Sequence, residues 1–519
     1  MTRRQADVRW PLRDRLFGID PRALAWFRIC IGGIVLVDLF DRAADLERHY
    51  TDAGVLPRAD LARLFGFSRW YWSLHLLSGS VAGQAALFGA AAVAALALMV
   101  GYRTRLATVV TWLLLASLQA RNPMLLYGAD HLLRLLLFWS IFLPLGSCWS
   151  VDRARLGGSA DGPMRHCSAA SAAILLQMSS MYFFSGLLKQ NQDWQSGEAL
   201  SHVLSFDMYV KPWAESLRQY PELLRHLSRA IPWLEIVLAL LLFAPWGTAR
   251  LRGVALVLLA GFHLTIESLF STGLFQYVAL TGLTLFLPTA FWNRLPGAVE
   301  LGPAARPQSR HGGRWLAHAA VQLLVLALFT YVLVWNVAGL GLEGYWARER
   351  LSFVQEIWRR GESKPLPILP RDAIVERRLG GLGAVGRVAG LYQRWDMFYR
   401  AGGFLGGWPV FVATLRDGSR ISLLEMGIPF QGDAHPKPSR ILALYPNARW
   451  LAYLTDLRDP GMQAARELLA GVVGRDWNRR HPELAIDRLE MLFVQDRQDV
   501  APGAGRQTTV WFEGPVSPD

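Results

Sequence analysis

Residues 170–189 read ASAAILLQMSSMYFFSGLLK, an apolar run of membrane-spanning length that closes on a lysine. A transmembrane α-helix needs about 20 mostly apolar residues, and fewer where the span is short. Eight other runs are of the same kind, near residues 22–40, 82–101, 105–120, 130–146, 231–245, 252–267, 273–290 and 316–338. The sequence therefore predicts a mainly α fold, a polytopic membrane helical bundle of about nine spans.

The composition of the 519-residue chain supports this class and divides the chain in two. Its mean hydropathy is +0.22, with 52% hydrophobic and only 18% charged residues, which is too apolar for an ordinary soluble protein. After Gly341 the composition becomes that of a soluble domain. We expect a transmembrane domain over residues 1–340 and a small β-rich α+β domain over 341–519. Its predicted elements are a β-hairpin near 409–424 that turns at Asp417-Gly418, a helix over 461–475 and strands at 486–495 and 507–513.

Arginine sets the expected orientation. The N-terminal tail and alternate short loops are rich in arginine, whereas the intervening short loops carry little. Arginine-rich short loops lie on the cytoplasmic side, so we expect a cytoplasmic N-terminus and, after nine spans, an extracytoplasmic C-terminal domain. The formal net charge of +13 falls largely in these cytoplasmic loops, which fits a bilayer with anionic lipids and not a nucleic acid. No cysteine or histidine spacing typical of a metal site occurs, so no metal is expected.

Lys189 is the first candidate functional residue. Only four of the 54 Lys and Arg residues are lysine, and this one lies where a predicted span meets water. Arginine stays charged at any working pH, whereas an amine near apolar surface can lose its proton and act as a base. Two interpretations remain open at this point. Lys189 either anchors a helix end at the lipid headgroups or carries chemistry, as ionisable groups at membrane depth often do.

Two histidines reinforce the second interpretation. His131 opens the predicted span at 130–146, and His263 lies late in the span at 252–267. Under the predicted orientation these histidines and Lys189 all fall in the outer half of the membrane. Each histidine has a structural alternative, a hydrogen bond at a helix end or to a backbone carbonyl. Because burying ionisable groups in lipid is costly, three at one depth predict a shared polar pocket.

Other side chains near this level extend the predicted pocket. Glu267 lies one helical turn beyond His263 and can share its face. Asp193 and Glu198 follow Lys189, and either can pair with the amine and weaken it as a base. Aromatic side chains either line a slot for a ring-shaped ligand or simply pack at the membrane interface. The aromatic candidates are Phe184, Phe262, Phe270 and Tyr277.

Two stretches carry a family resemblance. Residues 262–278, FHLTIESLFSTGLFQYV, and residues 186–194, GLLKQNQDW, resemble signatures of the vitamin K-dependent γ-glutamyl carboxylases. Residues 21–40, residues 50–57, Arg121-Asn122-Pro123 and Asp130-His131 are similar to the bacterial members, the HTTM (horizontally transferred transmembrane domain) group. The resemblance extends over about residues 15–425. It implies a bacterial inner or plasma membrane protein.

The resemblance also implies a reaction. In that family a lysine placed like Lys189 deprotonates a reduced quinone, whose reaction with O2 forms an epoxide and drives carboxylation of glutamate side chains. The implied cofactor is reduced vitamin K or menaquinol, with O2 and CO2 as co-substrates and a secreted glutamate-containing protein or peptide as partner. His131 and His263 would hydrogen-bond quinone oxygens or CO2. Asp130, Asp193, Trp194 and Glu267 would support them around the substrate.

Two other functions compete with this enzyme. The first is a non-enzymatic membrane maturation factor or chaperone for exported proteins, in which replacing Lys189 would be harmless. The second is a transporter. No paired spans broken by glycine or proline occur in matching halves of the chain, which is the usual sequence mark of a transporter.

Overall fold

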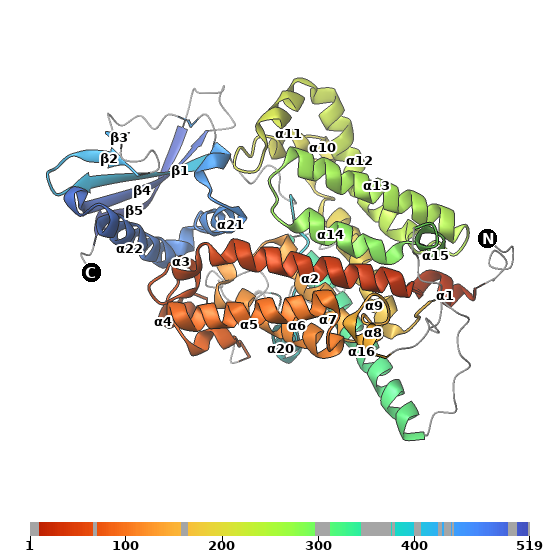
Figure 1. Ribbon diagram of the computed structural model, residues 1–519. Helices are drawn as coiled ribbons and strands as arrows, with labels where there is room; N and C mark the ends of the chain where they lie inside the picture. The colour runs from red at the N-terminus through yellow and green to blue at the C-terminus, as the bar shows by residue number, and fades with distance from the viewer. Residues whose placement is uncertain are drawn as a thin grey trace.

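The computed structural model describes residues 10–65, 70–156, 165–295, 312–343, 375, 379–398, 406–423, 428–429, 437–438, 441–496 and 506–516. The described chain is mostly helical, with one small antiparallel sheet near the C-terminus (Figure 1). The sheet lies at one end of the long helix α2 (Pro21–Ala43), and helices α10 to α13 gather on another side of the molecule.

Within the described residues, five helices are long and apolar enough to cross a membrane: α2, α5 (Val81–Val100), α9 (Ala169–Leu188), α13 (Thr248–Leu269) and α16 (Gly312–Glu343). Each coincides with one of the nine predicted spans. The other four predicted spans fall on helices that are shorter or more polar: α6 (Thr104–Arg121), α7 (Gly128–Ser140), α12 (Pro221–Leu241) and α14 (Phe275–Leu283). The helical, membrane-spanning class is thus confirmed, and the number nine stays a prediction.

Shorter helices connect and cover these long ones. The α-helices are α1 (Leu12–Phe17), α3 (Leu46–Tyr50), α4 (Arg58–Phe65), α8 (Val151–Arg155), α10 (Gln192–Ser196), α11 (Ala199–Val203), α15 (Thr289–Trp292) and α20 (Gly383–Val388). The 3-10 helices are Leu74–Leu77, Pro123–Leu125, Pro212–Gln219, Thr284–Phe286, Gly380–Leu382, Ile441–Leu444, Pro460–Met462 and Pro482–Leu484.

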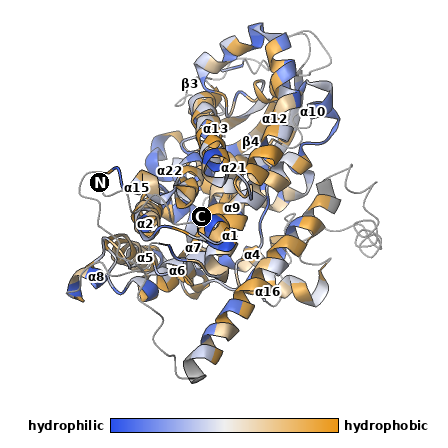
Figure 2. Cartoon of the chain, turned by 90° about the vertical axis from the view of Figure 1, so that its right-hand side faces the viewer, coloured by the Kyte–Doolittle hydropathy of each residue, from blue (hydrophilic) through white to orange (hydrophobic). Residues whose placement is uncertain are grey.

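Helix α9 is the central helix of the bundle. It packs against α7, α12, α14 and α16. In its apolar 18-residue segment, 78% of the residues are buried, compared with 28% in the corresponding segment of α13. Large apolar side chains are instead exposed along α5, α13, α16 and the second half of α12, and Figure 2 colours α16 mostly as hydrophobic. An apolar surface of this extent suits contact with lipid, whereas a soluble protein would cover it.

A small cap covers the end of α9. We use the word cap for α10, α11 and the 3-10 helix Pro212–Gln219. Its apolar side chains, Trp194 and Val203 among them, form a cluster that also includes Phe270, the residue after α13. The cap places Trp194 over the end of α9, next to Lys189.

The C-terminal sheet has the strand order β3-β2-β1-β4-β5, and its neighbouring strands are antiparallel. The strands are β1 (Gly407–Leu415), β2 (Arg420–Ser422), β3 (Ile428–Pro429), β4 (Ile486–Asp496) and β5 (Arg506–Pro515). The predicted hairpin is confirmed, and Gly418 turns it with a φ of 84°. The predicted helix is α22 (Gln463–Arg480), which packs on β4 and β5. The strand predictions at 486–495 and 507–513 are also confirmed.

A buried charge cluster joins this C-terminal part to the bundle. Arg449, near the start of α21 (Ala448–Asp456), bonds both Asp38 of α2 and Asp130 of α7, and Arg42 bonds the same two carboxylates. All four side chains are at most 2% exposed. Burial by itself lowers the pKa of the Arg449 guanidinium, but the surrounding anionic groups raise the pKa well above its usual value.

Candidate functional site

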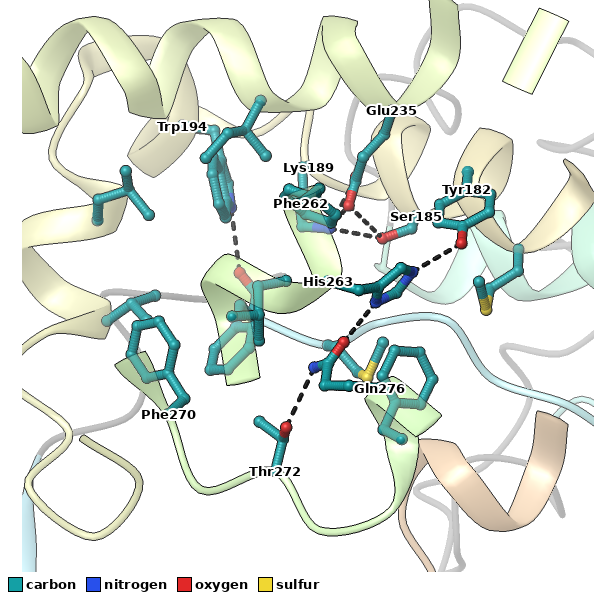
Figure 3. A pocket seen from close by; sticks show the side chains of 18 residues that line it. Tyr182, Ser185, Lys189, Trp194, Glu235, Phe262, His263, Phe270, Thr272 and Gln276 are labelled. Carbon is teal, nitrogen blue, oxygen red and sulfur yellow. Dashed lines mark hydrogen bonds and ion pairs between the residues drawn. The ribbon is translucent and has the colours of Figure 1, made fainter. Parts of the chain in front are cut away.

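A mostly apolar cavity lies where α9, α12, α13 and α14 meet the cap, with about 90 Å³ of free volume (Figure 3). Most of its wall is apolar or aromatic, and a few polar side chains point into it. The lining residues are Met181, Tyr182, Ser185, Lys189, Trp194, Leu200, Val203, Ile231, Glu235, Phe262, His263, Ile266, Phe270, Thr272, Phe275, Gln276, Met397 and Phe398.

Lys189 and Glu235 form a buried pair in this cavity. The Lys189 Nζ lies 2.9 Å and 2.8 Å from the two carboxylate oxygens of Glu235, and 2.5 Å from the Oγ of Ser185. The side chains of the pair are 6% and 5% exposed. An ammonium has three hydrogens to donate, and these three oxygens accept all of them. The charge is further covered by Trp194, whose ring centre lies 5.7 Å from Nζ.

The carboxylate that pairs with Lys189 is Glu235, which was not among the predicted site residues. Asp193 and Glu198 follow the lysine along the chain, but neither lines the cavity. Glu235 comes from α12, which packs closely along α9. It is the only charged residue between residues 230 and 246. An ionisable residue within an apolar span is often functional, so the sequence already contained a signal for Glu235.

A second polar group in the cavity centres on His263. The hydroxyl of Tyr182 lies 2.7 Å from the Nε2 of His263, and the Nδ1 of His263 contacts the Oε1 of Gln276. The Nε2 of Gln276 in turn donates to the Oγ1 of Thr272 at 3.1 Å. Tyr182, His263 and Gln276 are almost fully buried. Gln276 and Thr272 were not among the predicted site residues.

The structure brings Lys189 and His263 to one cavity but leaves His131 outside it. Helix α7 is turned so that His131 faces the ring of Tyr392, with 5.9 Å between ring centres, and its Nδ1 lies 3.2 Å from the Nη2 of Arg134. The adjacent Asp130 belongs to the buried charge cluster with Arg449. The predicted pocket of Lys189, His131 and His263 is therefore corrected. The observed cavity contains Lys189 and His263, together with Glu235, which was not predicted.

The other predicted residues divide in the same way. Trp194, Phe262 and Phe270 line the cavity. Phe184 is buried but packs outside it, against Phe183. Tyr277 is half exposed, and its hydroxyl lies 3.5 Å from Glu267, which pairs with Lys211 at 3.6 Å. Glu267 thus does not line the cavity with His263, although the two residues are one helical turn apart on α13.

The arrangement provides proton acceptors inside an apolar enclosure. Carboxylate, amine, imidazole and phenol groups are all present, and aromatic side chains surround them. Among the residues that the structure describes, no three His, Cys, Asp or Glu side chains are placed to hold a metal ion. The chemistry that these groups support is proton transfer on an apolar, ring-sized molecule.

A bundle of membrane-length apolar helices around a buried cavity with paired titratable groups defines a polytopic membrane protein. The family model of the HTTM domain matches residues 18–292, just over half of the chain, and the chain belongs to this family. The matched range contains every residue that lines the cavity except Met397 and Phe398. No solved structure matches the chain.

Proposed function

We propose that this protein is an integral membrane enzyme that oxidises a reduced quinone in the cavity beside Lys189. The observation that carries the proposal is the convergence of the Lys189–Glu235 pair and His263 on one apolar cavity. A buried pair of this kind is costly to form, and its place in a cavity favours a functional role over headgroup anchoring.

The cavity wall suits an aromatic ring. Phe262, Phe270 and Phe275 offer ring faces and edges, and the polar groups are few and clustered. The free volume of about 90 Å³ is smaller than the ~300–1,000 Å³ of a typical ligand pocket. Binding therefore requires wall side chains to move apart. Phe398 is one of the wall residues. Its backbone is in the left-handed region with a φ of 57°, which is uncommon for a residue other than glycine.

Glu235 gives Lys189 a route to the neutral amine. Moving one proton from the ammonium to the carboxylate leaves two neutral groups and no change in total charge. The amine then accepts the proton of a substrate hydroxyl, and the resulting oxyanion lies beside the new ammonium. Burial keeps bulk water away from that oxyanion. The pair as a whole takes up one proton, so the base is the pair and not the lysine alone.

By resemblance to the γ-glutamyl carboxylases, we propose that O2 is the oxidant and that the quinone leaves as an epoxide. The reaction would drive addition of CO2 to glutamate side chains of a secreted protein or peptide. In this proposal the protein lies in a bacterial inner or plasma membrane with a cytoplasmic N-terminus. The C-terminal sheet, placed outside, is where a water-soluble partner would approach. The reduced vitamin K or menaquinol would enter from the bilayer.

The test is an oxygen-uptake assay on the full chain in lipid nanodiscs with reduced vitamin K or menaquinol. We expect quinol-dependent O2 consumption and epoxide formation. Lys189→Ala and Glu235→Gln should each lower the rate by about 100-fold or more, the usual contribution of a general base. Lys211→Ala is the matched control, because this lysine pairs with Glu267 outside the cavity and its loss should leave the rate unchanged.

Two results would overturn the proposal. One is a Lys189→Ala variant with the full rate. The other is an absence of quinol-dependent O2 uptake by the wild-type protein. If deletion of the gene also stops the export of a client protein, the competing function, a membrane maturation factor, takes its place.

A further inference from the structure

The hydrogen bonds around His263 determine which of its ring nitrogens carries a hydrogen. The amide nitrogen of Gln276 donates to Thr272, so the amide oxygen is the atom that faces His263 (Figure 3). A carbonyl oxygen only accepts, and the Nδ1 of His263 must therefore carry the hydrogen. The Nε2 of the neutral ring is then an acceptor, and the hydroxyl of Tyr182 donates to it across 2.7 Å.

This direction of donation decides what Tyr182 can offer a ligand. Its only hydroxyl hydrogen is used by His263, so its oxygen is left as an acceptor on a residue that lines the cavity. A ligand hydroxyl is the matching donor. When such a hydroxyl gives its proton to the Tyr182 oxygen, Tyr182 can pass its own proton to the Nε2 of His263. The tyrosine is unchanged, the ligand oxygen gains a negative charge, and His263 becomes an imidazolium.

The Tyr182–His263 pair and the Lys189–Glu235 pair are separate proton acceptors in one cavity. The Lys189 Nζ lies against Ser185, which follows Tyr182 by three residues on α9. Residues three apart on a helix lie on the same face, ~5 Å apart along the axis, so the two acceptors reach the cavity from one face of α9. A ring that carries one hydroxyl at each end can reach both.

We propose that the cavity takes a dihydroxyaromatic substrate by both hydroxyls, with Tyr182 as the second proton acceptor and His263 as the base behind it. One substrate proton goes to the Lys189–Glu235 pair and the other passes through Tyr182 to His263. His263 thus acts through Tyr182 and is a positioning residue, with Gln276 holding its ring. The inference rests on the proposed function and adds to it the group that meets the second hydroxyl.

The test combines anaerobic binding with turnover, using menaquinol and its two monomethyl ethers, each blocked at one hydroxyl. The wild-type protein should bind menaquinol several-fold more tightly than the ether that is blocked at the Tyr182 end. Tyr182→Phe should lose this preference and keep the preference against the other ether. Tyr277→Phe is the matched control, because its hydroxyl lies outside the cavity beside Glu267, and it should bind all three probes like the wild type.

Turnover measurements distinguish proton transfer through Tyr182 to His263 from a role of these two residues in packing alone. Tyr182→Phe and His263→Gln should each lower kcat for menaquinol about 100-fold, whereas KM for menaquinol should rise at most several-fold. The double variant should be no slower than either single variant, since the two residues work as a unit. Independent losses that multiply in the double variant, or a Tyr182→Phe protein with wild-type kcat, overturn this inference while the proposed function stands. A wild-type protein without quinol-dependent O2 uptake removes both.

Discussion

At the scale of single residues, the pairing of Lys189 with Glu235 changes how the site is understood. An isolated amine at a helix end would be an anchor or a simple base. The carboxylate of Glu235, 2.8 Å away and buried, ties the two side chains together, so neither acts on a ligand without the other. The same principle applies to Tyr182 and His263. Their hydrogen bond makes the tyrosine hydroxyl the donor and the Nε2 of the histidine the acceptor.

The buried pair leads to a stability prediction. Lys189→Met and Glu235→Leu should each lower the free energy of unfolding by about 3–5 kcal/mol, because each leaves one charge buried without its partner. The double variant Lys189→Met with Glu235→Leu should recover most of that loss, since no uncompensated charge remains. Unfolding in detergent, followed for all four proteins, measures this cycle. Losses that simply add in the double variant would show that the two side chains do not interact.

At the scale of helices, the site depends on how closely α9 approaches α12. Gly186 lies on the face of α9 that meets α12, and a Cβ atom there would come 2.6 Å from the backbone oxygen of Pro232 and 2.7 Å from Ile236. Glu235 lies on the same segment of α12. Because Gly186 has no side chain, α12 can come close enough to α9 for Glu235 to reach Lys189.

A single methyl group tests this close approach. Gly186→Ala should lower the free energy of unfolding by about 1–3 kcal/mol through overpacking, and it should lower quinol turnover by separating Glu235 from Lys189. Gly261→Ala on α13 is the control, because nothing lies within 4 Å of its added Cβ. That change should stabilise the protein by about 0.5–1 kcal/mol through helix propensity. Equal thermal shifts for the two variants would argue against a special contact at Gly186.

At the scale of the whole molecule, the cluster around Arg449 holds the C-terminal part on the bundle. It joins α21 to α2 and α7 through charges that are almost completely removed from water. Its neutrality requires two arginines for two aspartates. Removing one arginine leaves a net negative charge in a dry site.

Arg449→Met should therefore lower the free energy of unfolding by about 3–5 kcal/mol and make the C-terminal sheet easier to cleave by protease. Arg479→Met is the control, since Arg479 also connects the C-terminal part to the bundle, by a 3.7 Å pair with Glu47, but is 60% exposed. Exposed pairs contribute about 0–1 kcal/mol, so its loss should be small. Unfolding and limited proteolysis of both proteins compare the two contacts. Similar losses for Arg449 and Arg479 would show that the cluster does not hold the two parts together.

The amino-acid sequence by itself determined the features that depend on neighbouring residues. Runs of apolar residues of membrane length identified the long helices, and the Asp417-Gly418 turn identified the hairpin. The rarity of lysine in the chain, and its place at the end of a span, identified Lys189. Only the tertiary structure decided which of these residues meet. Glu235 reaches Lys189 from 46 residues away, and Arg449 reaches Asp130 across 319 residues. The turn of α7 that takes His131 out of the cavity is set in the same way, because helix rotation follows from packing between helices and not from the sequence of one helix.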